Sequence, residues 1–474
     1  MGKIYDLAIV GMGAAGLTAG PFAVALGARV AVIEKDRIGG DCTWTGCVPS
    51  KTLIKAARLM HQMRSADRFG LDPVEPRLRY EAVLSHIQKV VDDIYQPTSP
   101  ESLRSKGMEV FLGEPRFVDA HTISIGGETI TARRTILGTG AHPFVPPIPR
   151  LESVNYLTYL NMWETETLPE HLMIVGAGPI GRELSQAFRR LGSRVTLLEA
   201  NQTLTEDPDA ATVIAAALTN DGVNLRLGTT VERVWQDNHG IHLVAGTEEV
   251  VGDVLLVAAG RRPNVDGLDL EKAGVRYSAK GIPVNRYLRT SHPDVYAAGD
   301  CTGGLQFSHY AGWQGFMAVR NALLPVKTSG VSEFVPWCIF TDPEMSQVGL
   351  TEPQARKRYG GDVRTLRWPM AKVDRALNES EASGFLKIVY DRKGKILGVT
   401  IVAAQAGEMI NEWVIAMREG FKVDGLARSI HTYPTYSIAS MQAGAAISVD
   451  KALSGLSGKL VRRVARVSRR KDRA

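Results

Sequence analysis

The chain has 474 residues, of which 44% are apolar and 22% are charged, and its formal net charge is +6. This length is too great for one ordinary hydrophobic core and favours about three domains. Because no run of about 18 apolar residues could span a membrane, and the first residues lack a signal-peptide layout, we expect a cytoplasmic protein. Four cysteines in a chain of this size exclude the disulfide framework of a small secreted protein.

The first predicted elements are a strand, a helix and a second strand in the segment YDLAIVGMGAAGLTAGPFAVALGARVAVIEK. Gly11, Gly13 and Gly16 separate the first strand from the helix in the pattern G-x-G-x-x-G. The first glycine permits a tight turn, the second lets a pyrophosphate approach the helix N-terminus, and the third lets helix and strand pack closely. Glu34, at the end of the second strand, is placed to bind a ribose hydroxyl. We therefore predict a dinucleotide site at the start of the chain.

The next segment, GGDCTWTGCVPSK, places Cys42 and Cys47 five positions apart. The pair could be a structural disulfide, part of a metal site or a redox couple. Five residues of regular helix advance about 7.5 Å, whereas the Cα atoms of disulfide partners lie at most about 6.8 Å apart. A disulfide here therefore requires a distorted turn and should be reducible. A helix N-terminus would stabilise a thiolate, while a metal site needs two further Cys or His ligands that this stretch lacks.

The segment HLMIVGAGPIGRELSQAFRRLGSRVTLLEA predicts a second unit of strand, helix and strand. Gly176, Gly178 and Gly181 repeat the glycine pattern, and Glu199 repeats the acidic residue at the same distance. Two such motifs with matched carboxylates are much stronger evidence than one. A carboxylate at Glu199, with no arginine directly after it, disfavours a 2′-phosphate. The second site is therefore predicted to bind NADH in preference to NADPH.

With these motifs, the segments TILGTGAHP (135–143), LLVAAGRRPNVDGL (255–268), DVYAAGDCTGG (294–304) and VPWCIFTDPEMSQVGLTE (335–352) make the chain resemble the class I flavoprotein disulfide reductases. That family includes dihydrolipoyl dehydrogenase, glutathione reductase and mercuric reductase. The resemblance implies an α/β homodimer with two Rossmann-like dinucleotide-binding domains and a C-terminal α+β dimerisation domain. The implied boundaries are 1–148 and 263–335 for the FAD-binding domain, 149–262 for the NAD(P)-binding domain, 336–450 for the dimerisation domain and 451–474 for a basic tail.

The same resemblance implies that FAD and NAD(P)H are the cofactors and that the two cysteines are a redox couple. Cys42 would be the outer thiol that meets the electron acceptor, and Cys47 the inner thiol beside the flavin. Lys51 and Glu183 would form an ion pair near the flavin, and Asp300 would bind its ribitol chain. Three further residues would line the cofactor site: Thr139, Gly140 and Gly260. No resident metal is predicted.

The chain departs from this family near its C-terminus, where SIHTYPTYSIAS replaces a catalytic His-Pro-Thr motif. Tyr433 occupies the position of the catalytic histidine, and Ile438 that of the glutamate that orients it. His431 fits a structural role better than that of a base. A phenol with a pKa near 10 is a poor proton relay, and loss of a general acid or base lowers rates about 10²- to 10⁴-fold. We therefore do not expect efficient reduction of ordinary disulfides, although Tyr433 remains a candidate catalytic residue.

A small-molecule electron acceptor is expected instead, either a metal ion such as Hg²⁺ or a quinone. The cysteine motif resembles that of mercuric-reductase-like members, but no cysteine follows Cys338 to deliver a metal ion. Pro179 stands where related proteins often carry a tyrosine that covers the flavin, so a quinone could reach the ring. Two alternatives stay open: a dihydrolipoyl dehydrogenase with an unconventional acid or base, and a slowly reacting flavin-binding regulatory protein.

The positive charge is concentrated in residues 458–474, which hold eight Lys or Arg residues and one Asp. The rest of the chain is close to neutral and offers no basic surface for nucleic acid. Apolar residues three and four positions apart in this region predict a basic amphipathic helix that could contact an anionic membrane peripherally. A solvated tail is the alternative. The other two cysteines, Cys301 and Cys338, fit buried apolar positions.

Overall fold

The computed structural model describes residues 3–204, 207–454, 458 and 462. The chain divides into two compact units: the first contains Met1–Gln202 and Gly222–Ser332, and the second contains Thr203–Asp221 and Glu333–Ala474. The domain boundaries given above remain predictions, and most of the basic tail lies outside the described residues. Within the described part of the chain, no helix is long and apolar enough to cross a membrane.

A parallel sheet of five strands forms one core of the first unit. Its strands are short apolar runs, and four of them are buried along their whole length, because helices cover one face and the strands β5, β6 and β7 (within residues 115–132) cover the other. Only the edge strand β4 is partly exposed. The strand order is β19-β8-β2-β3-β4, with β2 (Leu7–Val10), β3 (Val30–Glu34), β4 (Met108–Leu112), β8 (Thr135–Leu137) and β19 (Val295–Ala297).

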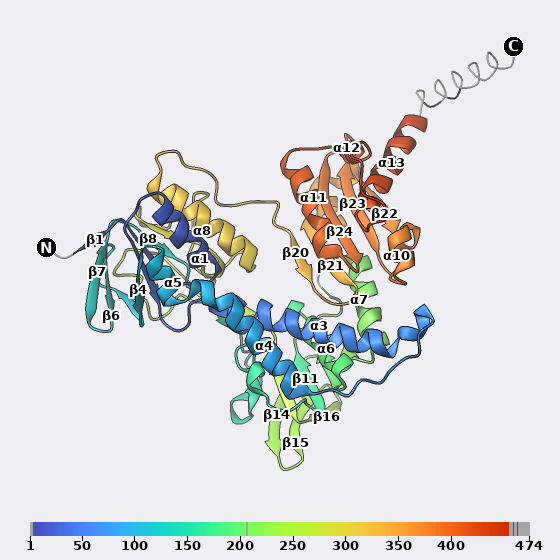
Figure 1. Ribbon diagram of the computed structural model, residues 1–474, viewed down its shortest axis with the longest axis horizontal. Helices are drawn as coiled ribbons and strands as arrows, with labels where there is room; N and C mark the ends of the chain where they lie inside the picture. The colour runs from blue at the N-terminus through green and yellow to red at the C-terminus, as the bar shows by residue number, and fades with distance from the viewer. Residues whose placement is uncertain (1–2, 205–206, 455–457, 459–461, 463–474) are drawn as a thin grey trace. The chain divides into compact units, whose positions relative to one another are not determined.

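Two helices rich in small residues pack together beside this sheet. Helix α1 (Ala14–Ala25) follows β2, and α8 (Ser308–Leu323) lies next to it, drawn in blue and yellow in Figure 1. A Cβ atom on Gly315 of α8 would lie 2.2 Å from the carbonyl oxygen of Ala15, so the two backbones are in direct contact there. The small residues of α1 and α8 thus allow close packing between two helices that lie far apart in the sequence of this unit.

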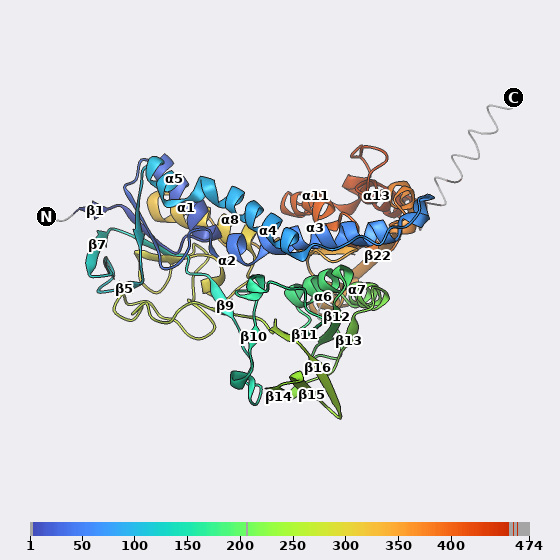
Figure 2. The ribbon, with the colours of Figure 1, turned by 60° about the horizontal axis from the view of Figure 1, so that its bottom comes forward.

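After β3 the chain forms two consecutive helices with a short break between them. These are α2 (Gly40–Trp44) and α3 (Cys47–Arg64). Helix α4 (Tyr80–Tyr95) runs alongside α3 (Figure 2). On α4, Ile87 and Val91 are buried, and residues four positions apart share one face of a helix.

The second glycine motif belongs to another parallel sheet in the first unit. Its strand β11 leads into α6 (Pro179–Leu191), which starts with proline, a residue whose missing N–H is not needed at a helix start. The strand order is β10-β17-β11-β12-β13, with β10 (Tyr156–Leu157), β11 (His171–Val175), β12 (Arg194–Leu198), β13 (Asn224–Arg226) and β17 (Val254–Val257). The two Rossmann-like halves expected from the sequence are both present.

The second unit is built on an antiparallel sheet of five strands covered by helices. Trp413 of α11 (Ala406–Arg418) is fully buried, and its indole N–H donates to the hydroxyl of Ser440 at 3.1 Å. Ser440 belongs to α13 (Ile438–Leu453). The strand order is β20-β21-β24-β23-β22, with β20 (Trp337–Ile339), β21 (Glu344–Gly349), β22 (Val363–Pro369), β23 (Phe385–Asp391) and β24 (Ile396–Ala403). This is the predicted α+β domain.

A buried ion pair fastens another segment to this antiparallel sheet. Lys387 of β23 is 3% exposed, and its ammonium group lies 2.7 Å from Oδ1 of the fully buried Asp207. Asp209 also pairs with Lys387. Asp207 caps the N-terminus of α7 (Pro208–Asn220), so this helix is tied to the second unit. Removing one partner of such a buried pair is strongly destabilising, by about 3–5 kcal/mol.

The remaining elements are short. They are β1 (Ile4–Tyr5), β5 (Pro115–Phe117), β6 (Thr122–Ile125), β7 (Glu128–Ala132), β9 (Ala141–Pro143), β14 (Val231–Asp237), β15 (Gly240–Ala245), β16 (Glu248–Gly252), β18 (Arg261–Pro263), α5 (Pro100–Ser105), α9 (Glu352–Tyr359), α10 (Asp374–Asn378) and α12 (Val423–Leu426). Strand β9 pairs with β18, and β14, β15 and β16 form an antiparallel sheet.

Replacement by alanine should affect the stability of the protein differently at the two glycines near the start of α6, Gly178 and Gly181. A Cβ atom on Gly181 would lie 1.9 Å from the carbonyl oxygen of Gly176, whereas on Gly178 its nearest contact would be Ala258 at 4.0 Å. Gly181→Ala should lower the thermal midpoint, because overpacking costs about 1–3 kcal/mol and exceeds the gain of about 1 kcal/mol in helix propensity. Gly178→Ala is the matched control and should keep the wild-type midpoint; equal midpoints for both variants would contradict this account.

Candidate active site

The two cysteines lie on either side of a break between two helices. Cys42 belongs to α2 and Cys47 is the first residue of α3, while Thr45 and Gly46 interrupt the helical bonding between them. Both cysteines are free thiols, and their side chains hydrogen-bond to each other. The distorted turn that the spacing required for a disulfide is therefore present.

The sulfur of Cys47 is the one placed to carry a negative charge. The pKa of Cys47 is lowered to about 6, and the largest cause is a hydrogen bond from the Cys42 thiol. Desolvation raises this pKa, whereas the positive charge of Lys51 lowers it further. The start of α3 also favours an anion. The same hydrogen bond, together with burial, raises the pKa of Cys42. At neutral pH, Cys47 is a thiolate and Cys42 is the thiol that donates to it.

Lys51 and Glu183 form the ion pair expected from the resemblance. The Lys51 ammonium lies 2.7 Å from Oε2 of Glu183, whose side chain is only 5% exposed. Lys51 is one turn after Cys47 on α3, and Glu183 is on α6, so the pair links the two Rossmann-like halves. Ser308, at the start of α8, was not predicted; its hydroxyl lies 3.8 Å from the sulfur of Cys47.

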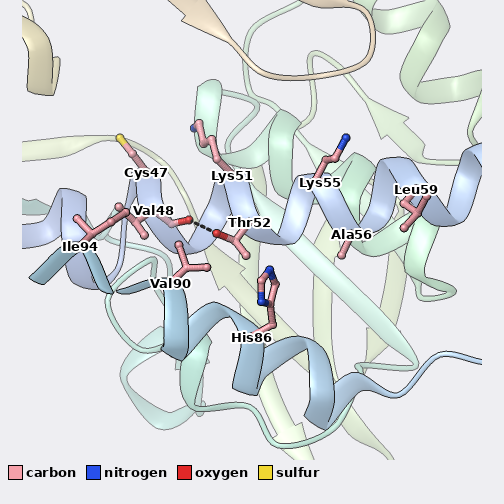
Figure 3. A pocket seen from close by; sticks show the side chains of 10 residues that line it. All are labelled: Cys47, Val48, Lys51, Thr52, Lys55, Ala56, Leu59, His86, Val90 and Ile94. Carbon is pink, nitrogen blue, oxygen red and sulfur yellow. Dashed lines mark hydrogen bonds between the residues drawn. The ribbon is translucent and has the colours of Figure 1, made fainter. Parts of the chain in front are cut away.

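A groove of about 680 Å³ runs between α3 and α4, with Cys47 at one end (Figure 3). Val48 from α3 and Val90 and Ile94 from α4 give it apolar walls. His86 projects between the two helices farther along. This volume is in the range of small-molecule sites, which are commonly apolar with a few polar groups.

Both predicted acidic residues lie against their own glycine loops in the same way. Oε2 of Glu34 accepts a hydrogen bond from the backbone N–H of Met12 at 2.7 Å. Oε2 of Glu199 accepts one from the backbone N–H of Ala177 at 2.8 Å. Each donor stands between the first two glycines of its motif, so the two sites repeat one geometry and present one carboxylate each at the end of a strand.

The space around the glycines fits bound dinucleotides. A Cβ atom on Gly11 or Gly176 would lie 2.4 or 2.6 Å from a carbonyl oxygen of an adjacent loop, and on Gly16 it would lie 2.2 Å from that of Gly11, so these positions serve chain packing. Gly13 and Gly178 instead have room beside them, with nearest contacts at 3.8 and 4.0 Å. Both cap the helices that follow and use no side chain to do so, which leaves N–H groups for phosphate oxygens.

The other predicted cofactor-binding residues come from two segments that meet. Thr139 and Gly140 lie between β8 and β9, and Gly260 directly precedes β18. Asn264 joins these segments: its backbone carbonyl accepts from the Thr139 hydroxyl at 2.8 Å, and its N–H donates to the Gly140 carbonyl. Apart from its two chain neighbours, no atom of the residues that the structure describes lies within 4 Å of a Cβ built on Gly140. The loops are thus open to a ligand at Gly140.

Asp300 forms an ion pair with Arg261, a residue that was not predicted from the sequence. Arg261 binds Oδ2 of Asp300 at 2.7 Å and Oδ2 of Asp41 at 3.0 Å. Burial raises the pKa of Asp300, and the charge of Arg261 opposes that effect. The motif GRRPN contains this arginine and GGDC contains Asp41, so both were visible in the sequence. Neither motif, however, indicates that the two residues meet.

Tyr433 lies in the second unit and is not a ready proton donor. Its side chain is 64% exposed, and its hydroxyl donates to the carboxylate of Asp374 at 2.8 Å. That bond raises the pKa of Tyr433 above the usual value for a phenol. Ile438 is buried at the start of α13. Of the two residues at the positions of the missing dyad, one is thus a phenol with a raised pKa and the other is apolar.

His431 forms a pair with a carboxylate that the sequence did not reveal. Its Nε2 lies 2.8 Å from Oε2 of Glu412, and its Nδ1 lies 2.9 Å from the carbonyl oxygen of Ser429. Desolvation lowers the pKa of His431, but the hydrogen bonds that its ring donates to Glu412 and to the Ser429 carbonyl outweigh it, so the pKa is raised. Both ring nitrogens are occupied within the protein, which supports the structural role predicted for this residue.

The remaining candidates are structural. Cys301 is completely buried, as predicted, whereas Cys338 is only partly buried, because its strand β20 is at the edge of its sheet. Tyr436 is buried and donates to Glu379 at 2.8 Å. Among the residues that the structure describes, no group of three or more His, Cys, Asp or Glu side chains is arranged to hold a metal ion.

The pKa of Cys47 gives a test of the thiol pair. In the reduced protein, the rate of Cys47 alkylation by iodoacetamide should rise with pH to a midpoint near 6. Cys42→Ala should move that midpoint to higher pH by more than Lys51→Gln does, because the hydrogen bond is the larger cause. Cys42→Ser keeps a donor and is the control. Peptide mass spectrometry measures each rate, and a wild-type midpoint near the ordinary value of about 8.5 would contradict the arrangement.

The sequence matches known proteins over most of its length. Residues 5–315 match the family described as pyridine nucleotide-disulphide oxidoreductase, and residues 335–443 match its dimerisation domain, which supports a homodimer. Mercuric reductase of Bacillus cereus is 36% identical over 461 residues, which are 96% of this chain and 73% of that protein. Dihydrolipoyl dehydrogenase of Thermus scotoductus is 35% identical over 457 residues, which are 94% of this chain and 98% of that protein.

Solved structures show the same fold. The Cu(II) complex of the HOCl-induced flavoprotein disulfide reductase RclA from Escherichia coli is 29% identical, with a TM-score of 0.85 over 94% of this chain and 100% of that chain. LpdA from Mycobacterium tuberculosis is 28% identical, with a TM-score of 0.86 over 93% of this chain and 99% of that chain. The chain therefore belongs to the pyridine nucleotide-disulphide oxidoreductase family, whose members depend on FAD and NAD(P)H.

Proposed function

We propose that this protein takes electrons from NADH and passes them through the Cys42/Cys47 pair to an acceptor that is not a disulfide, with a soft metal ion such as Hg²⁺ as the first candidate. The observation that carries this proposal is a Cys47 thiolate, paired with the Cys42 thiol, in a chain that lacks the acid and base at positions 433 and 438. FAD, when bound, would supply the hydride acceptor between NADH and the cysteines.

The proton balance favours a metal ion over a disulfide. Oxidation of the pair joins the sulfurs of Cys42 and Cys47 and releases two electrons and the one proton held on Cys42. Hg²⁺ takes the two electrons to become Hg⁰ and needs no proton. A disulfide substrate releases a thiolate that must be protonated, and Tyr433, whose pKa is raised, is poorly suited to that task.

A quinone is the second candidate, and the groove between α3 and α4 favours it. The apolar walls at Val48, Val90 and Ile94 suit a planar ring, and Cys47 lines one end of the same groove with its sulfur pointing away from α4. A quinone needs two electrons and two protons, of which Cys42 supplies one proton and solvent the other. The exposed His86 stands beside the groove and offers a path for that second proton.

The chain's own residues would orient the two nucleotides. Glu34 and Glu199 would accept hydrogen bonds from ribose hydroxyls, and the N–H groups at the starts of α1 and α6 would bind pyrophosphate oxygens. The carboxylate of Glu199 would repel a 2′-phosphate, which supports NADH over NADPH. Lys51, held by Glu183, would place a positive charge beside Cys47 and the flavin. Contact of the basic tail with an anionic membrane stays a prediction.

Two other functions fit less well. A dihydrolipoyl dehydrogenase would need His431 to move protons, but both of its ring nitrogens are engaged by Glu412 and Ser429. A flavin-binding regulatory protein would have no use for a stabilised thiolate at Cys47 or for the buried pair of Glu183 with Lys51.

An acceptor panel tests the proposed function. With the purified holoenzyme and NADH under anaerobic conditions, reduction of Hg²⁺ or 1,4-naphthoquinone should be at least about 10²-fold faster than that of lipoamide or glutathione disulfide. Cys42→Ser should abolish Hg²⁺ reduction, while Cys338→Ser, on an edge strand, should leave it unchanged. Lipoamide reduction as fast as that of Hg²⁺ and naphthoquinone would overturn the proposal.

The role of His431 is tested by the residual lipoamide activity. Because its ring is occupied within the protein, His431→Gln should change this slow rate by less than about twofold. A loss of 10²-fold or more, the size expected for a general acid or base, would instead support the dihydrolipoyl dehydrogenase alternative. Stopped-flow measurement of flavin reduction by NADH serves as the control, since it does not involve the lipoamide step.

A further inference from the structure

The turn between the two cysteines is held from outside by two aromatic side chains. The hydroxyl of Tyr159 donates to Oδ2 of Asp41 at 2.9 Å, and the indole N–H of Trp163 donates to the carbonyl oxygen of Thr45 at 2.8 Å. Asp41 directly precedes Cys42, and Thr45 lies two residues before Cys47. Both ends of the turn therefore have a partner in the segment 159–163, which belongs to the same compact unit.

The backbone next to the turn lacks the usual donor for the carbonyl oxygen of Thr45. The bonds within the turn converge on another atom, the carbonyl oxygen of Asp41, which accepts from the N–H groups of Thr45 and Gly46. The residue four positions after Thr45 is Pro49, which has no N–H, so α3 lacks the usual helical donor to the Thr45 carbonyl. The indole N–H of Trp163 takes the place of that donor, and it also lies 3.2 Å from the carbonyl oxygen of Tyr159.

The Asp41 contact belongs to a larger polar network. Arg261 binds Asp41 at 3.0 Å and Asp300 at 2.7 Å, and its guanidinium lies 5.4 Å from the centre of the Tyr159 ring. Tyr159 is 5% exposed, so its hydroxyl is shielded from competing water. The carboxylate of Asp41 is thus fixed from two directions by side chains outside the turn.

We propose that Tyr159 and Trp163 are positioning residues that hold Cys42 against Cys47 and thereby set the reduction potential of the Cys42/Cys47 disulfide. This inference rests on the redox role proposed above. The break at Thr45 and Gly46 brings Cys42 next to the start of α3, and the Cys42 side chain lowers the pKa of Cys47, which stabilises the reduced form. Stabilising the reduced form makes a disulfide more readily reduced. Without the two donors the turn relaxes, the contact weakens, and the disulfide becomes harder to reduce.

The test is the dithiol–disulfide equilibrium of the holoenzyme in glutathione redox buffers, read by alkylation and mass spectrometry. Tyr159→Phe and Trp163→Phe each remove one donor and keep an aromatic ring. Each should shift the equilibrium constant toward the disulfide by about tenfold, which is about 30 mV for this two-electron couple. The alkylation midpoint of Cys47 should rise in the same variants, because its hydrogen bond from Cys42 is weakened.

Two matched variants separate this role from a general loss of stability. Tyr156→Phe removes a hydroxyl from the same segment, and Trp235→Phe removes an indole N–H from β14; neither group contacts the turn, and neither variant should shift the equilibrium. Shifts of less than twofold in both Tyr159→Phe and Trp163→Phe, or equal shifts in the controls, would overturn the inference. If the wild-type cysteines form no disulfide in any buffer, the redox proposal itself fails.

Discussion

The interruption of the helix at Thr45 and Gly46 is the constraint on which the site depends. A continuous helix would hold the two sulfurs too far apart for a bond. The break brings the Cys42 thiol onto the sulfur of Cys47 and starts a new helix at Cys47. One local feature therefore provides both the contact between the thiols and the environment that stabilises a thiolate.

The sequence predicted the parts of the structure that follow from local pattern. Both glycine motifs stand between a buried strand and a helix, and Glu34 and Glu199 lie at their strand ends as the spacing indicated. The need for a distorted turn followed from the distance between Cys42 and Cys47. These predictions succeeded because each depends on residues that are close in the chain.

Contacts between distant segments were predicted only where the family resemblance supplied them, as for Lys51 and Glu183. Arg261 meets Asp41, Tyr159 meets the same carboxylate, and His431 pairs with Glu412, yet no periodicity or spacing connects these residues. The resemblance, and no local pattern, assigned residues 263–335 to the same domain as residues 1–148, and β19 from that later segment lies in the parallel sheet around β2. Composition indicates that such residues are polar, and only the folded chain determines which of them meet.

The buried Lys387 has a consequence for how the chain can be divided. Its carboxylate partners Asp207 and Asp209 are contributed by residues 203–221, which lie in sequence between two strands of the nucleotide-binding sheet but belong to the C-terminal unit. A fragment beginning after residue 332 would keep the ammonium group buried without these two counter-ions and would retain only the more distant carboxylate of Glu352, at 3.7 Å, among the described ion pairs of Lys387. Neither unit is a contiguous stretch of sequence, so no single proteolytic cut releases both intact.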